Sequence, residues 1–122
     1  MATLSTALTI TSTTTTSDAL SISLTDTLTI ANPIIDSGRV SVATGAYTEI
    51  VDAAVSAITY VYIKNLDATN YVIVYNDAGS PGAFARLHPG EFCIFPVNAS
   101  TGCSLKANTA ACKIEYGKWT KG

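Results

Sequence analysis

Few side chains in this sequence could carry out acid–base or nucleophilic chemistry. The chain has a single histidine, His88, and three cysteines, Cys93, Cys103 and Cys112. A catalytic triad needs a nucleophile, a base and an orienting acid close together in space, and no G-x-S-x-G motif marks such a nucleophile here. His88 begins the sequence His-Pro-Gly-Glu, which is typical of a tight turn with glycine at its third position. We therefore interpret His88 as a turn residue and predict no catalytic residue.

The histidine and the cysteines are also ligand types for zinc, but their spacing does not fit a zinc site. Structural zinc sites use pairs of cysteines two to four residues apart, and no such pair is present. An odd number of cysteines without a secretory signal argues against a disulfide framework. We interpret the cysteines as reduced, buried, small apolar residues, with a Cys103–Cys112 disulfide across a hairpin as the alternative. The sequence predicts no metal and no cofactor.

Acidic and basic residues are sparse and scattered. Four aspartates fall in turn sequences, where they cap backbone N–H groups: Asp18, Asp36, Asp67 and Asp77. No pattern brings two carboxylates together as glycoside hydrolysis requires, and no glycine-rich phosphate-binding motif occurs. The seven basic residues form no cluster, which argues against a nucleic-acid partner. No apolar run approaches the ~20 residues of a membrane-spanning helix, so we expect no membrane partner.

The elements that would position any site are β-strands. Apolar residues alternate with Thr and Ser from Leu4 to Ile10 and again from Leu20 to Ile30. This period of two is the mark of a half-buried strand, and threonine fits a pleated surface. Thr11 to Asp18 contains no apolar residue, so we predict a turn there. Thr48 to Asp52 is interpreted as a further strand in preference to a helical turn.

Two segments near the middle of the chain are apolar on both faces. Residues 58–63 and 71–75 both mix tyrosine with Val and Ile, which is typical of interior strands covered on both sides. The short polar connection between them predicts a β-hairpin. Counting turn signals gives eight to ten short strands, which predicts a single all-β domain, an antiparallel sandwich or barrel.

Tyrosines on these two segments are the remaining candidates for ligand binding. Tyr60, Tyr62, Tyr71 and Tyr75 would share one predicted hairpin and could fall on one surface. Cross-strand packing is one interpretation of such a set. Stacking on a sugar, as in a carbohydrate-binding β-sandwich module, is the other.

Residues 57 to 96 resemble a pattern found in small virion proteins of tailed bacteriophages. In that pattern an interior strand ends in Lys-Asn, here Lys64-Asn65, and a short turn leads to Asn-Tyr, here Asn70-Tyr71. A later segment ends in Leu-x-Pro-Gly-Glu, here Leu87 to Glu91. The resemblance implies a β-sandwich, often jelly-roll-like, that is built into a phage particle and decorates or cements the capsid or sits on the tail.

From these observations we expect a non-enzymatic virion protein, made and assembled in the host cytoplasm. Its first expected role is capsid decoration, bridging and stabilising subunits of the major capsid protein, as a homo-oligomer such as a trimer. Charged residues are 13% of the chain, about half the usual ~25%, which suits strand faces that meet other protein. The alternatives are a tail or adsorption-apparatus component and the carbohydrate-binding module.

We expect the contact with the partner protein to lie at the start of the chain. Residues 1–18 are predicted to form an N-terminal arm or first strand, and residues 19–122 the β-sandwich domain. The residues expected to touch the partner are Leu4, Leu8 and Ile10, because chain ends are free to dock unless they are tied down.

Overall fold

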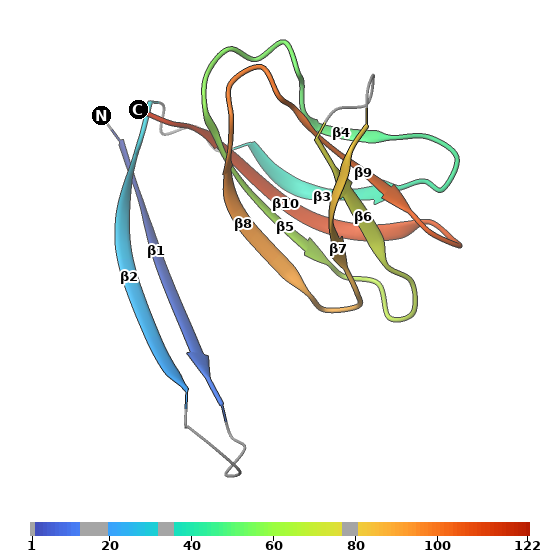
Figure 1. The fold of residues 1–122 in the computed structure, drawn as a ribbon, viewed down its shortest axis with the longest axis horizontal. Helices are drawn as coiled ribbons and strands as arrows, with labels where there is room; N and C mark the ends of the chain where they lie inside the picture. The colour runs from blue at the N-terminus through green and yellow to red at the C-terminus, as the bar shows by residue number, and fades with distance from the viewer. Residues whose placement is uncertain (1, 13–19, 32–35, 77–80) are drawn as a thin grey trace.

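The computed structural model describes residues 2–12, 20–31, 36–76 and 81–122, and in these ranges the chain forms ten strands and no helix (Figure 1). All strand pairs are antiparallel. The predicted all-β class is therefore confirmed. The strands are β1 (Ala2–Thr11), β2 (Ser21–Ile30), β3 (Asp36–Val42), β4 (Thr48–Val51), β5 (Thr59–Asn65), β6 (Val72–Tyr75), β7 (Ala83–Leu87), β8 (Phe92–Val97), β9 (Cys103–Ala107) and β10 (Cys112–Thr120).

Eight of the strands form a sandwich with jelly-roll topology. One sheet has the order β3-β10-β5-β8 and the other the order β4-β9-β6-β7. Pairs of consecutive strands, such as β3 and β4 or β9 and β10, therefore belong to opposite sheets, as in a jelly roll of two Greek keys. This arrangement confirms the predicted jelly-roll-like sandwich and decides it against a barrel.

The predicted hairpin between residues 58–63 and 71–75 is wrong. β5 pairs with β10 and β8, whereas β6 pairs with β9 and β7. The polar connection between β5 and β6 crosses from one sheet to the other instead of turning back within a sheet. Each strand does lie in the interior of its own sheet, but only its core-facing side is fully buried: Ile73 and Tyr75 on the outer side of β6 are half-buried.

The core lies between the two sheets and is made of inward-facing aliphatic side chains. Val61 and Ile63 of β5 meet Val74 of β6 and Leu105 of β9 there, all fully buried. The core also holds cysteines, because Cys103 and Cys112 are fully buried and Cys93 packs against the same cluster. These residues act as small apolar side chains, as the sequence predicted.

All three cysteines are free thiols. Cys103 lies on β9 and Cys112 on β10, which belong to opposite sheets, so the alternative of a disulfide across a hairpin is wrong. Burial raises the pKa of the Cys103 thiol to about 12 and that of the Cys93 thiol to about 11. Both thiols are therefore protonated and unreactive at neutral pH.

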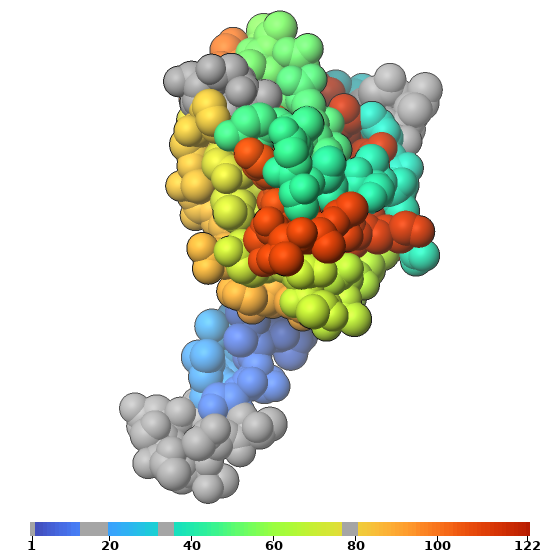
Figure 2. Space-filling model, turned by 90° about the vertical axis from the view of Figure 1, so that its right-hand side faces the viewer, coloured from blue at the N-terminus to red at the C-terminus, as the bar shows by residue number. Residues whose placement is uncertain are grey.

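The first two strands form a separate two-stranded hairpin that projects from the sandwich (Figures 1 and 2). β1 and β2 pair along their whole length, from Ala2 opposite Ile30 to Thr11 opposite Ser21. The two strands predicted from the alternation are thus confirmed. Of the predicted turn at Thr11 to Asp18, the structure describes only residues 11 and 12, and residues 13–18 lie outside the described residues. The expected boundary at residue 18 falls between two strands that the structure places in one sheet.

The base of the hairpin is tied to β10 by main-chain hydrogen bonds. The Ala31 N–H donates to the Thr120 carbonyl at 2.9 Å, and the Gly122 N–H donates to the Thr29 carbonyl at 2.9 Å. Ile30 and Lys121 form an antiparallel bridge between them. The hairpin is thus hydrogen-bonded to the end of β10, which is an interior strand of the sandwich.

Candidate functional site

The hairpin has one apolar face and one hydroxyl-rich face. The antiparallel register places Leu4 opposite Leu28, Leu8 opposite Leu24, and Ile10 opposite Ile22. All three pairs lie on the same face. The opposite face carries Thr, Ser and one Ala, because successive side chains of a strand point to opposite sides. The residues predicted to touch a partner all lie on the apolar face: Leu4, Leu8 and Ile10.

Coverage of this apolar face falls from the base of the hairpin to its distal half. Ile30 at the base is buried, Leu4 and Leu8 are half-buried, and Leu24 is 53% exposed. Ile10 is exposed as well. The sandwich therefore covers the proximal half of the face, and the distal end of the hairpin projects beyond the sandwich (Figure 1).

The surface that the hairpin overhangs is the outer face of β5 and β8. Across these strands Tyr60 pairs with Pro96 and Tyr62 with Ile94. Tyr60, near the base of the hairpin, is only 9% exposed, whereas Phe92 further along β8 is 52% exposed. The outer face of this sheet is thus as apolar as the hairpin face above it.

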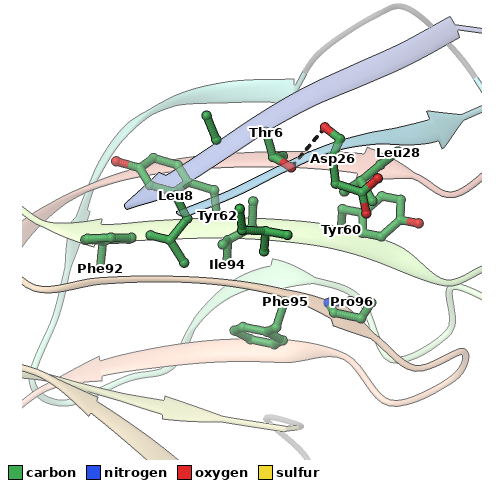
Figure 3. Close-up of a pocket in the computed structure, with 12 residues that line it drawn as sticks. Thr6, Leu8, Asp26, Leu28, Tyr60, Tyr62, Phe92, Ile94, Phe95 and Pro96 are labelled. Atoms are coloured by element: carbon green, nitrogen blue, oxygen red, sulfur yellow. Dashed lines mark hydrogen bonds between the residues drawn. The ribbon is translucent and has the colours of Figure 1, made fainter. Parts of the chain in front are cut away.

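A groove separates the two apolar surfaces. Its volume is about 470 Å³, which is within the range of small-ligand pockets. Leu8 lies on its hairpin side, and Tyr62, Phe92 and Ile94 lie on its sandwich side (Figure 3). Leu24 of β2 also lines the groove. Both walls present mainly carbon atoms, so the groove favours apolar side chains over charged groups.

Three of the four polar side chains that line the groove, those of Thr6, Asp26 and Tyr62, are engaged in local hydrogen bonds. The Thr6 hydroxyl donates to the Asp26 carbonyl at 3.3 Å, and the Asp26 carboxylate accepts from the Thr27 N–H at 2.7 Å. The Tyr62 hydroxyl donates to the Glu115 carboxylate at 3.1 Å. Desolvation, and then the hydrogen bond and charge of Glu115, raise the pKa of Tyr62. Thr6 and Asp26 both line the groove, but the Thr6 hydroxyl donates to the main-chain carbonyl of Asp26 and not to its carboxylate.

His88 lies away from the groove, in the turn between β7 and β8. Gly90 has a φ of 81° and the Glu91 N–H donates to the His88 carbonyl at 3.0 Å, which confirms the predicted turn. The Glu91 carboxylate accepts from the His88 N–H at 2.6 Å and lies 3.4 Å from its Nδ1. The imidazole is exposed and tilts against the Tyr71 ring at 5.4 Å. These contacts define a turn whose side chains stabilise its backbone.

Neither a metal cluster nor a membrane-spanning helix is found in the part of the chain that the structure describes. No three His, Cys, Asp or Glu residues there are grouped as metal ligands would be. No helix there is long and apolar enough to cross a membrane.

The four tyrosines do not share a surface. Tyr60 and Tyr62 lie on the outer face of the sheet that contains β5, beneath the hairpin. Tyr71 and Tyr75 flank the buried valines of β6 in the other sheet. The predicted common surface is wrong because β5 and β6 belong to different sheets, and the carbohydrate-binding alternative loses the surface on which it depended.

The sandwich wall of the groove was not predicted from the sequence. Phe92, Ile94 and Pro96 alternate with Cys93 and the other inward residues of β8. β8 is an edge strand of its sheet, and an edge strand with apolar residues on both faces is unusual unless something covers its outer face. That signal is present in the sequence Phe-Cys-Ile-Phe-Pro-Val, but it can be used only once β8 is known to be at an edge.

Comparison with known proteins adds one structural similarity. No protein-family model and no curated protein matches the chain. Among solved structures, a chain from Bacillus endospore appendages, described as a family of disulfide-linked pili, is similar over 78% of this chain and 91% of its own. The sequence identity is 17% and the TM-score is 0.47. The fold assignment above rests on the sheets themselves, which define a jelly-roll β-sandwich with a protruding β-hairpin.

Proposed function

We propose that this protein is a non-enzymatic structural subunit that docks on another protein through the apolar face of its hairpin. The observation that carries the proposal is the exposed distal half of β1 and β2. A two-stranded hairpin is at best marginally stable alone in water, and contiguous exposed apolar residues mark interaction sites. A protein surface laid on this face would bury the leucine and isoleucine side chains and stabilise the strands.

Within this class, we propose that the protein decorates the capsid of a tailed phage, with the major capsid protein as its partner. The support is the resemblance of residues 57 to 96 to small virion proteins and the jelly-roll topology, which viral capsid domains share with lectins and cupins. A protein that binds the assembled capsid and not its free subunits would stabilise the capsid by mass action. A place on the tail would use the same hairpin contact.

The energetics favour docking on a repetitive surface. Fully burying a Leu or Ile side chain contributes about 2 kcal/mol, so completing the burial of the four half-exposed residues of the distal hairpin contributes about 4 kcal/mol. Association itself costs at least about 4 kcal/mol. One hairpin alone therefore binds weakly, and several linked copies on a lattice would gain affinity by avidity.

The test is co-sedimentation with phage particles. Purified virions of the phage that encodes the chain should contain it by mass spectrometry, and recombinant chain should pellet with particles that lack it. Leu24→Asp on the apolar face should abolish pelleting. Thr25→Asp, on the opposite face and equally exposed, should pellet like the wild type.

Two results would contradict the proposal. One is absence of the chain from purified virions, which would remove the phage role. The other is equal pelleting by the two aspartate variants, which would show that the apolar face of the hairpin is not the contact. His88→Ala should bind like the wild type, since the turn that contains His88 lies outside the groove.

A further inference from the structure

We propose that the hairpin of one copy docks on the outer face of β8 in a second copy, so that the chain assembles with itself. This inference rests on the proposed role of the hairpin as a protein contact, and it assigns that contact to a second copy of the chain instead of the capsid protein. We call Ile10, Leu20, Ile22 and Leu24 the hairpin patch, and Phe92 with Ile94 the β8 patch.

The two patches account for most of the exposed large apolar side chains. Eight such side chains are exposed among the described residues; four belong to the hairpin patch and two to the β8 patch, and the others are Val55 and Phe84. Docking of the hairpin patch on the β8 patch would cover six of these eight side chains in one contact. A single chain therefore carries both halves of one apolar interface.

The hairpin does not complete this contact within its own chain. Protein interiors are close-packed and have few voids larger than a water molecule. The groove of about 470 Å³ that Leu24 and Ile94 line is far larger than that. The hydrogen bonds from the hairpin to the described part of the sandwich are confined to its base, at Thr29, Ile30 and Ala31. The distal half is thus held in place by its stem and not by packing.

The proximal half of the hairpin shows that this sheet face accepts such a surface. Leu28 and Tyr60 lie together at the base of the groove (Figure 3), where Tyr60 is nearly buried. The cross-strand rows of the sheet continue from Tyr60–Pro96 through Tyr62–Ile94 to the β8 patch. A second hairpin placed on the β8 patch would extend an aliphatic-on-aromatic contact that the chain already makes.

The nearest charges are compatible with this contact. Asp26 lies on the apolar face of the hairpin next to the hairpin patch, and Lys64 pairs across the sheet with Phe92. These two charges are opposite. The nearby Glu115 carboxylate has the same sign as Asp26, but it lies across from Lys64 and 3.6 Å from the Arg39 guanidinium, which offset it. Because the two patches differ, the contact is directional and generates a reciprocal pair with exchanged hairpins, a closed ring or an open filament.

A complementation experiment tests the inference with the full chain. Sedimentation is measured from about 1 μM to about 1 mM, the range of a weak to moderate contact. Leu24→Asp breaks the hairpin patch and Ile94→Asp breaks the β8 patch. Thr25→Asp on the opposite hairpin face and Ser41→Asp on β3, in the same sheet as β8 but at its other edge, are the matched controls. Circular dichroism and the unfolding midpoint check that each variant is folded.

Wild type and both controls should associate, and each broken variant alone should be monomeric. An equimolar mixture of Leu24→Asp and Ile94→Asp should recover association, because one variant supplies an intact hairpin and the other an intact β8 patch. If Ile94→Asp does not fold, Phe92→Gln replaces it at the same patch. A monomeric wild type, or a mixture that stays monomeric, would overturn the inference.

The outcome separates this inference from the proposed function. If the wild type is monomeric but Leu24→Asp still abolishes pelleting with phage particles, the hairpin contacts a foreign protein, so the inference fails and the proposed function stands. If complementation succeeds but the chain never pellets with particles, the self-contact stands and the virion role fails.

Discussion

The sandwich and the hairpin use the same kind of strand but differ in what covers it. Both alternate aliphatic residues with others, and both pair in antiparallel register. In the sandwich a second sheet covers each inner face, so Leu105 is fully buried. In the hairpin no described layer covers the distal half, so Leu24 remains half-exposed. Alternation is therefore enough to make a strand, whereas the stability of that strand comes from a layer that faces it.

Truncation in the core should have the largest effect on stability. Leu105→Ala removes a fully buried side chain from between the sheets and should lower the free energy of unfolding by about 2–5 kcal/mol, because a cavity is left behind. Urea denaturation measures the change. A loss well below ~1 kcal/mol would show that the sandwich core is no better packed than the hairpin.

A buried polar side chain should matter nearly as much. Asn65 is fully buried, and its side-chain N–H₂ donates to the main-chain carbonyls of Asn70 and Leu87 at 2.9 and 3.0 Å. Its side-chain oxygen accepts from the Asp67 N–H at 2.9 Å. Asn65→Ala leaves these groups unpaired and should cost about 3 kcal/mol. Asn108→Ala, at a more exposed position, is the comparison in the same denaturation experiment and should cost less.

Alkaline pH should weaken the sandwich through its buried thiols. The pKa of Cys103 is raised from 9.0 to about 12 in the folded chain, so between these values the folded state holds a proton that the unfolded state releases. Stability is therefore intact below pH 9 and falls as pH rises above it, by about 1.4 kcal/mol per pH unit for this thiol.

Denaturation at pH 8, 9, 10 and 11 measures this slope. Cys103→Ala should make it shallower, although the raised pKa of Cys93 keeps part of it. The described hairpin strands contain no cysteine, so the slope reports the sandwich alone. An unchanged slope in Cys103→Ala would contradict the assignment.

The smallest effect is expected in the hairpin of the isolated chain. Leu24→Ala at an exposed position should change global stability by less than about 0.5 kcal/mol. Hydrogen exchange should show the β1–β2 amides opening at lower free energy than those of β5 and β10, since few buried contacts hold them. Equal protection in dilute monomer would mean that the hairpin is as stable as the sandwich without any partner.

Much of the fold follows from local patterns. The strands at 21–30 and 48–51 follow from residue type and spacing. The tight turn at Gly90 does too, because glycine is suited to the positive φ that the turn requires. The partners of β5 and β6 do not follow from local patterns, since a short polar connection suits a hairpin and a crossing between sheets equally well. Which sheet a strand joins is decided by the whole core.

One wall of the candidate site follows from local patterns in the sequence, and the other wall does not. The shared parity of Leu4, Leu8 and Ile10 places them on one face once a strand is assumed. The opposing wall at Phe92 and Ile94 is visible only after β8 is placed at the edge of its sheet and the hairpin over it. Parity is a property of one strand, whereas a groove is a property of two elements far apart in the sequence.

The stem of the hairpin has a mechanical consequence. Its main-chain bonds lead into β10, which is flanked by β3 on one side and β5 on the other. A pull on the hairpin is thus shared between these bonds and the chain itself, which leads from β2 into β3 at the edge of the same sheet. Because β3 pairs with β10 alone, both routes converge on the β3–β10 ladder, so tension on the hairpin acts on this ladder before it reaches the other strands.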